Sequence, residues 1–471
     1  MRRLGRALLA GTLAIGAAPP ARAWNDHALA TWVALQPMSA QAPLDEVVRA
    51  ESLERFLAAE APKLERLLDE HEAWARANLS PYAPRPDGIA FRAGTSARTP
   101  PAAAASGGAV APGEPGGDLR QRFLKALRLN VAARLPLYRQ LRAGEAAGPL
   151  RPLPWQEVSA FSDGNAGGAR LFEFVALDEG SEVPALEVLA TASQEPDFGL
   201  DIGLYADSGT AHGRLYGFGN QPFGNPALAF GSQAPFHMGL YHESRIVFAA
   251  ASFLRRTQTE ARIALFTALA RHALQNGHRY WGWRFTGWAL HYVQDLTQPY
   301  HASILPGLSP LRMIGINTVA MVGWTGPKTA ATTLVSNRHA VVESYQQQQM
   351  AQAWRAGRLD DPLLIALRDT RDDASRGAYR PEDTRARVSR EAFDAAAWLD
   401  AQLERSFPAR YTADPQVELR SETDDLDMVA ISRQHAPAEQ ERLQQQLAAL
   451  LKNLGVHTRA LVRAVLFGAA N

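Results

Sequence analysis

The chain has 471 residues, with 49 basic and 48 acidic side chains, and it contains no cysteine. The balanced charge makes a long nucleic acid a poor electrostatic match, and the absence of cysteine excludes disulfide bonds as a source of stability. With 46% apolar residues, the chain is expected to depend on a large core, on bound metal ions, or on both.

The N-terminus has the layout of a secretory signal peptide over residues 1–23. A basic start, MRRLGR, precedes the short apolar run ALLAGTLAIGAAPP and the small-residue cleavage site Ala-Arg-Ala. We expect cleavage between Ala23 and Trp24, and export to the periplasm or the extracellular space. Loss of the four arginines of the signal leaves 45 basic residues against 48 acidic ones, a net charge of about −3.

Helical patterning dominates the rest of the chain, and strand signals are weak. Apolar residues recur at helical spacing with charges between them, and Gly277 is expected to break a long helical region into two. Residues 160–240, rich in Gly, Asp and Phe, are expected to form loops and short elements that lead into a site. We therefore predict an all-α, mostly helical fold, with helical segments over 43–78, 119–145, 242–296, 328–356, 388–406 and 437–468.

The predicted organisation is a single catalytic domain over residues 24–410, followed by a C-terminal helical extension over 411–471, in a protein that acts as a monomer. Insertions interrupt the domain. The segment near 92–118 is rich in Pro, Gly, Ala and Ser, which indicates a flexible surface insertion rather than a core element.

The second insertion, the apolar segment 302–335, allows two interpretations. Its only charged side chains are Arg312 and Lys328, and Gly and Pro interrupt it. Apolar runs of this kind are usually buried in a core, which is the favoured interpretation. The alternative is an interfacial lid that touches a membrane surface.

Candidate metal ligands are concentrated in two short stretches. His291 and Asp295 are four residues apart, so a helix places both on one face, about one turn apart. His301 follows shortly after, and His339 and Glu343 repeat the same spacing. An imidazole and a carboxylate one turn apart can share a cation. One such pair is common on helix surfaces, but two pairs with a histidine between them favour a metal site.

These residues form the pattern HxxxDxxxxxH, followed by HxxxE, which resembles the zinc-dependent phospholipase C and single-strand nuclease superfamily. In that family the mature chain begins with tryptophan, whose amino group and carbonyl oxygen bind one of three zinc ions together with a nearby histidine. Trp24 and His27 fit these roles if the signal is removed after Ala23. Their spacing is shorter than expected for the family, but it works if a helix begins at once, because positions i and i+3 share a face.

The resemblance implies three bound Zn²⁺ ions. Trp24 and His27 are implied to hold the first ion. Asp295 is implied to bridge it to a second ion, which His291 also binds. The third ion is implied to be held by His301, His339 and Glu343.

The second ion needs one more Asp and one more His from the middle of the chain. We favour Asp197 with His237, although the 40 residues between them exceed the family's spacing. As the resemblance implies, Asp197 is also the candidate to orient or deprotonate the attacking water. The alternative pairs are Asp201 with His242 and Asp207 with His212.

A site with three zinc ions suits phosphodiester hydrolysis, because close metal ions generate hydroxide near neutral pH and neutralise charge on the phosphoryl group. The favoured function is a secreted phospholipase C that cleaves phospholipid headgroups. Two alternatives stay open: a secreted single-strand nuclease with the same metal core, which needs basic and stacking side chains, and a non-catalytic, zinc-stabilised binding protein. The expected partner is phospholipid, with peripheral membrane contact through 302–335, and nucleic acid is the weaker candidate.

Overall fold

The fold was analysed in a computed structural model, which describes residues 25–38, 43–94, 118–161, 171–419 and 425–468. The predicted signal peptide, Trp24 and most of the insertion near 92–118 lie outside the described residues. Helix makes up 63% of the described residues and strand 3%, which confirms the predicted all-α class.

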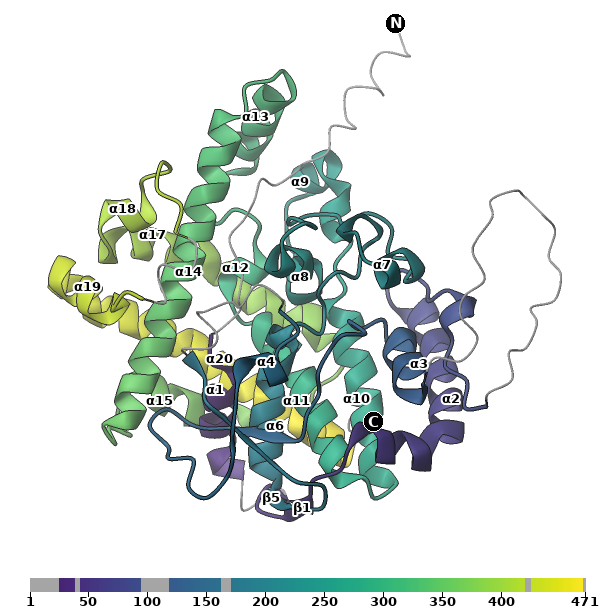
Figure 1. The fold of residues 1–471 in the computed structure, drawn as a ribbon. Helices are drawn as coiled ribbons and strands as arrows, with labels where there is room; N and C mark the ends of the chain where they lie inside the picture. The colour runs from purple at the N-terminus through teal and green to yellow at the C-terminus, as the bar shows by residue number, and fades with distance from the viewer. Residues whose placement is uncertain (1–24, 39–42, 95–117, 162–170, 420–424, 469–471) are drawn as a thin grey trace, which may run out of the picture.

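Long helices surround a central one, and shorter helical turns connect them (Figure 1). The α-helices are α1 (His27–Leu35), α2 (Leu53–Asn78), α3 (Leu119–Ala126), α4 (Trp155–Val158), α6 (Ala185–Gln194), α7 (Ala211–Leu215), α8 (Ala229–His237), α9 (Arg245–Ala250), α10 (Thr259–Gln275), α11 (Arg279–Asp295), α12 (Pro299–Ala302), α13 (Pro310–Met321), α14 (Gly326–Arg355), α15 (Pro362–Arg368), α16 (Asp373–Arg376), α17 (Arg390–Ser406), α18 (Ala409–Thr412), α19 (Met428–His435) and α20 (Gln440–Phe467).

The strands form two small antiparallel sheets at the margin of the helical body. β1 (Val47–Arg49) pairs with β5 (Glu182–Pro184). In the other sheet the order is β2-β4-β3, with β4 (Phe174–Ala176) in the middle. Its neighbours are β2 (Tyr138–Gln140) and β3 (Pro152–Leu153). These strands are two or three residues long, so they close loops rather than form a layer of the core.

Helix α11 is the centre of the fold. Almost all its side chains are buried, including Trp281, Trp283 and Trp288, as expected for a helix enclosed by protein. α10, α6 and α20 pack around it. Gly287 has no Cβ, and one built there would lie 2.6 Å from the carbonyl oxygen of Leu189 in α6. This glycine therefore allows α6 and α11 to approach closely.

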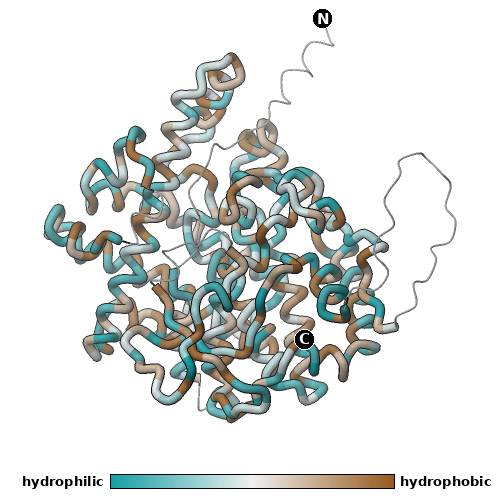
Figure 2. Tube along the Cα trace, viewed as in Figure 1, coloured by the Kyte–Doolittle hydropathy of each residue, from teal (hydrophilic) through white to brown (hydrophobic). Residues whose placement is uncertain are grey.

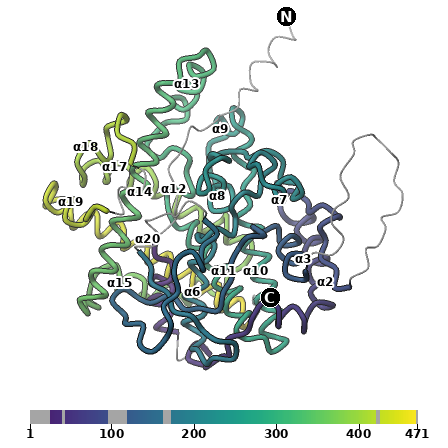
Figure 3. The backbone as a smooth tube through the Cα atoms, in the orientation of Figure 1, coloured from purple at the N-terminus to yellow at the C-terminus, as the bar shows by residue number. Residues whose placement is uncertain are grey.

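Several predicted helices are confirmed, among them α14, α17 and α20. The predicted break between α10 and α11 is also confirmed, since Gly277 has a φ of +85°, a conformation that glycine adopts without steric penalty. The C-terminal helix α20 packs against α1, α11 and α15. In Figure 3 the first described helix and the last thus lie side by side.

Two predicted helices are shorter than expected. The helix predicted over 43–78 begins only at Leu53, after the Ser52 cap, and strand β1 occupies part of its N-terminal region. The helix predicted over 119–145 ends at Ala126. Arg128, directly after the Leu127 cap, has a φ of +53°, outside the right-handed helical region, so the chain leaves the helix there and continues as loop and strand. The helix α6, within the region predicted as loops, was missed.

The prediction that the apolar segment 302–335 is buried is wrong. From Ile304 to Val335 most side chains are exposed or half-buried, and Met313 is the one buried residue of α13. Figure 1 shows α13 and the first turns of α14 projecting from the body as a helical hairpin, and Figure 2 shows apolar stretches on it. Among the described residues, no helix is long and apolar enough to cross a bilayer.

Candidate metal centre

The structure brings most of the predicted ligands together in the interior. They come from several elements: His27 begins α1, Asp197 lies in the turn η3 (Glu195–Phe198), His237 ends α8, and α11 and α14 supply two each. All are buried. Among the described residues, three groups place their ligand atoms within 4.8 Å of one another: His27, Asp197 and His291; His237, His291 and Asp295; and His301, His339 and Glu343.

Asp295 lies between two of these groups. Its Oδ2 is 2.8 Å from Nδ1 of His237 and 3.3 Å from Nε2 of His291. Its Oδ1 faces the other way and lies 3.3 Å from Nε2 of His27. A carboxylate whose two oxygens face different imidazoles has the geometry to bridge two cations, which is the role that the resemblance implied for Asp295.

The third group matches the predicted set residue by residue. Nδ1 of His301 is 2.8 Å from the carbonyl oxygen of His237, which leaves Nε2 directed inward. Nε2 of His339 lies 2.5 Å from Oε1 of Glu343. The rings of His301 and His339 are 5.0 Å apart and nearly perpendicular. An imidazole nitrogen and a carboxylate oxygen directed at one point are typical zinc ligands.

Unpartnered polar atoms test whether this cluster fits a cation. Nε2 of His301 is buried without a hydrogen-bond partner, and Nε2 of His27, Nε2 of His339 and Oδ1 of Asp295 make no hydrogen bond although each lies close to another group of the cluster. Buried polar atoms in proteins are normally paired, because leaving one unpaired costs about 1–3 kcal/mol. Several such atoms in one cluster of nitrogen and carboxylate donors fit a bound divalent metal, and Zn²⁺ prefers this donor set.

Neighbouring side chains and carbonyl groups orient the imidazoles. Nδ1 of His291 is 2.8 Å from the carbonyl oxygen of Ser193, a contact made possible by the close packing of α6 on α11. Nδ1 of His27 is 2.7 Å from Oε1 of Gln294. The side-chain amide of Gln294 in turn donates to hydroxyl oxygens of Thr31 and Thr458. Outer contacts of this kind fix which nitrogen of a histidine is free to bind metal.

A buried ion pair fixes Asp197 relative to α11. Glu195, in the same turn, accepts two hydrogen bonds from Arg284, at 3.0 and 2.7 Å, and one from the indole of Trp288 at 2.5 Å. Asp197 itself accepts a hydrogen bond from the side-chain amide of Gln194 at 3.0 Å. The turn is thus tied to the same helix that presents His291 and Asp295.

Of the candidates for the mid-chain ligands, Asp197 and His237 belong to the groups and the alternatives do not. Nε2 of His242 is 3.0 Å from the carbonyl oxygen of Arg385. Asp207 accepts from the backbone amide of Gln221 at the surface. His212 lies by the turn at Gly203, also outside the groups.

Asp201 has a supporting role that the sequence interpretation missed. Its Oδ2 lies 3.4 Å from Nε2 of His237, the nitrogen that faces away from Asp295. It accepts hydrogen bonds of 2.6 Å from Arg262 and from the hydroxyl of Tyr292. A carboxylate behind a histidine orients the ring and raises its basicity as a ligand. In the sequence, Asp201 is recognisable only by its position four residues after Asp197. That spacing does not tell which of the two is a metal ligand and which supports His237.

Burial has the largest influence on the pKa values of the cluster. It holds the pKa of His339 well below its usual value and also lowers that of His301. Burial alone would raise the pKa of Asp295, but the adjacent histidines hold it well below its usual value. For His237, Asp295 and Asp201 outweigh burial and raise the pKa to about 10. Without a cation, His237 thus holds a proton that a metal ion would displace.

The ligands predicted for the first zinc ion are only partly within the described residues, because Trp24 lies outside them. The helix α1 begins at His27, where Asp26 caps it by accepting from the amide of Leu29. The condition that a helix begins immediately after the signal is not met, because the N-cap Asp26 has a non-helical backbone. Asn25 is nevertheless 4% exposed, so the chain is already buried one residue past Trp24.

An apolar cavity of about 90 Å³ extends from the third group to the projecting hairpin. His339 lines its inner end, and Met313 and Ile316 of α13 face Val335 of α14 across it. One water needs roughly 10–15 Å³, so the cavity has room for a larger apolar group.

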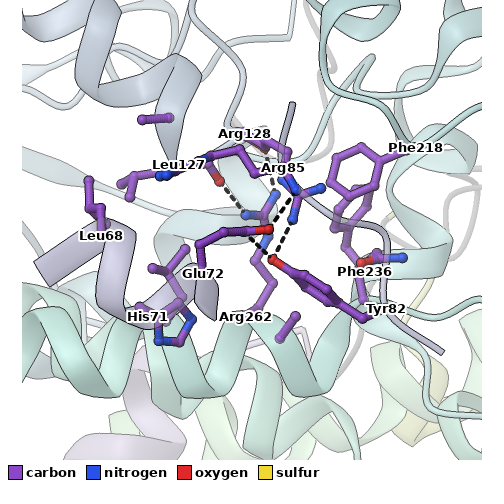
Figure 4. Close-up of a pocket in the computed structure, with 14 residues that line it drawn as sticks. Leu68, His71, Glu72, Tyr82, Arg85, Leu127, Arg128, Phe218, Phe236 and Arg262 are labelled. Atoms are coloured by element: carbon purple, nitrogen blue, oxygen red, sulfur yellow. Dashed lines mark hydrogen bonds between the residues drawn. The ribbon is translucent and has the colours of Figure 1, made fainter. Parts of the chain in front are cut away.

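A smaller, polar pocket lies behind Asp201 (Figure 4). The dashed lines in Figure 4 mark the hydrogen bonds of this pocket. Arg262 donates to the carbonyl oxygen of Leu127, and the Tyr82 hydroxyl donates to Glu72. Since Arg262 also donates to Asp201, we interpret the paired groups of this pocket as support for the metal cluster.

Replacing Asp201 by Asn should weaken zinc binding by about 10- to 100-fold without removing a ligand, which is typical of residues behind a metal-bound histidine. The amide lacks the negative charge that favours a proton on Nε2 of His237, the tautomer that leaves Nδ1 available for the metal. The measurement is competition with a chromophoric chelator. The control is Asp207→Asn at the exposed surface, which should bind zinc as the unaltered protein does. Equal affinities for both variants would contradict the role of Asp201.

Comparison with models of protein families, with curated proteins and with solved structures finds no match. The structure itself shows buried groups of His, Asp and Glu that could hold a metal ion.

Proposed function

We propose that this protein is an exported, zinc-dependent phosphodiester hydrolase of the phospholipase C type. One observation is decisive for this proposal. Three buried groups of zinc-type ligands adjoin one another, two of them share His291, and several of their nitrogen and oxygen atoms make no hydrogen bond. A cluster of this kind supports three cations close to one another, and phosphodiester hydrolysis uses such an arrangement.

The residues of the chain have distinct roles in this proposal. When bound, the cations supply water activation at neutral pH and neutralise charge on the phosphoryl oxygens. Asp295 connects two of the ligand groups, because one of its oxygens faces His27 and the other faces His237. Asp197 has one oxygen held by Gln194, and its other oxygen is 3.7 Å from His291. It is thus positioned to bind metal or to accept the proton of the attacking water.

The cavity beside His339 supports phospholipid as the substrate class. Its walls include Met238, Ile304 and Leu305, which would exclude water and accommodate an acyl group. A single-strand nuclease would need a basic groove with aromatic side chains for stacking bases. Apart from the candidate ligand His339, Lys328 is the one basic residue among those that line this cavity.

The experiment is hydrolysis by the exported, mature chain, with zinc content measured in the same preparation. We expect release of the phosphorylated headgroup from phosphatidylcholine, loss of this activity on chelation, and its recovery with Zn²⁺. Single-stranded DNA serves as the competing substrate. Zinc-loaded protein that cleaves DNA and no phospholipid would establish the nuclease instead. Loaded protein that cleaves neither would overturn both hydrolase functions.

N-terminal sequencing of the exported protein is a further check. The proposal expects the mature chain to begin at Trp24, because only then is a free amino group available next to His27. Any other start would remove that ligand from the first zinc site.

A further inference from the structure

The tip of the α13–α14 hairpin exposes large apolar side chains to solvent. Val322 is 82% exposed and Trp324 is 66% exposed, and Leu311 at the base of α13 is 75% exposed. Gly323, between the two tip residues, has a φ of +96°, which allows the tight turn. Single exposed apolar residues are ordinary, but a group of them on a projecting element marks an interaction site.

Acidic residues are absent from this part of the chain. With 48 acidic residues in 471, the 47 residues from 296 to 342 would hold about five on average, and they hold none. The stretch 244–259 also holds none, and its helix α9 packs against α13. Exposed basic side chains accompany the apolar ones in both stretches: Arg245, Arg255, Arg256 and Arg312. Apolar and tryptophan side chains beside basic ones are typical of proteins that bind anionic lipid surfaces.

The hairpin also connects its tip to the metal centre. The cavity is lined along α14 from Lys328 to His339, which are eleven positions apart and therefore separated by about 16 Å along the helix. That length is about half the 30 Å thickness of a bilayer's hydrocarbon core, and therefore about the length of one acyl chain. The outer end of this apolar path lies near the exposed tip, and its inner end lies at a candidate zinc ligand.

We propose that the α13–α14 hairpin docks on an anionic phospholipid surface, with Val322 and Trp324 in the headgroup region, and that the cavity beneath it receives the apolar part of one lipid. The docking is independent of catalysis, while the direction of the lipid toward His339 rests on the proposed function. The basic side chains of α9 and α13 face the lipid phosphates in this arrangement.

The test is flotation of the exported protein with vesicles of phosphatidylcholine containing 30 mol% phosphatidylglycerol. The double variant Val322→Asp/Trp324→Asp should bind at least about tenfold more weakly, because it places charge where apolar groups enter the interface. The matched control is Leu359→Asp/Phe467→Asp, which adds the same charge at exposed apolar positions elsewhere. It should bind as the unaltered protein does. Thermal unfolding of both variants checks that each is folded.

Each outcome decides the inference. Loss of vesicle binding in the tip variant alone supports it. Equal binding by the tip variant, or no binding by the unaltered protein, overturns it. A dimer of the unaltered protein that the tip variant converts to monomer, without vesicle binding, overturns it in favour of self-association. Vesicle binding through the tip in a protein that cleaves no phospholipid would leave the docking intact and reject the proposed function instead.

Discussion

Replacing Asp295 by Asn is expected to lower kcat/KM for phospholipid hydrolysis on the order of a thousandfold, because it would loosen the cations that neutralise charge in the transition state. Its two oxygens face His27 on one side and His237 and His291 on the other. An amide has one oxygen and no charge, so it cannot face both sides as an anion. Zinc content by elemental analysis should fall together with activity.

The matched control for this substitution is Asp394→Asn. Asp394 is an exposed residue of α17 that pairs with Arg390, and exposed pairs of this kind contribute little to stability. The control should retain both activity and zinc. An Asp295→Asn variant with full activity and full zinc content would rule out a bridging role for this carboxylate.

Removing the metal ions is expected to abolish activity and to lower the melting temperature by roughly 5 °C or more. A ligand at a thousand times its Kd stabilises the native state by about 4 kcal/mol, and each kcal/mol shifts Tm by about 2 °C in larger domains. Without cations, the buried nitrogen and carboxylate atoms of the cluster lose their partners. Calorimetry of the chelated and reloaded protein is the measurement.

The difference in Tm between the metal-free and the zinc-loaded protein is also expected to depend on pH. His237 has its pKa raised to about 10 in the metal-free fold, against about 6.5 when unfolded. Its proton therefore stabilises the metal-free fold fully below pH 6.5, and this contribution is lost as pH rises toward 10, by up to about 1.4 kcal/mol per unit. The zinc-loaded protein has no such proton to lose. The difference in Tm between the two forms should widen from pH 6.5 to 8.5, and a constant difference would contradict this linkage.

The sequence located those ligands whose spacing is set by a single helix. His291 and Asp295 lie one turn apart on α11, and His339 and Glu343 repeat this on α14, so local geometry was sufficient. The mid-chain ligands were harder, because Asp197 and Asp201 are four residues apart and both approach His237. Only the packing of α6 and η3 on α11 decides which of them enters the cluster.

The projecting hairpin could not be predicted for a different reason. An apolar run has the same composition whether it is enclosed in a core or directed at an external surface, so periodicity alone favoured burial for 302–335. The interfacial interpretation of the same segment stays a prediction, now with named residues at its tip. The supporting residues Gln294 and Glu195 left no pattern in the sequence, since their partners are 89 or more residues away.

The hydrogen bond between Gln294 and Thr458 has a consequence for the order in which the protein is assembled. Gln294 orients His27, which is among the first described residues, and it is held by a helix at the other end of the chain. The contacts that orient His27 therefore include a residue of the C-terminal helix α20. If the cluster binds metal as proposed, this contact exists only once α20 has packed, and a chain truncated before α20 should retain less metal, as measured by elemental analysis.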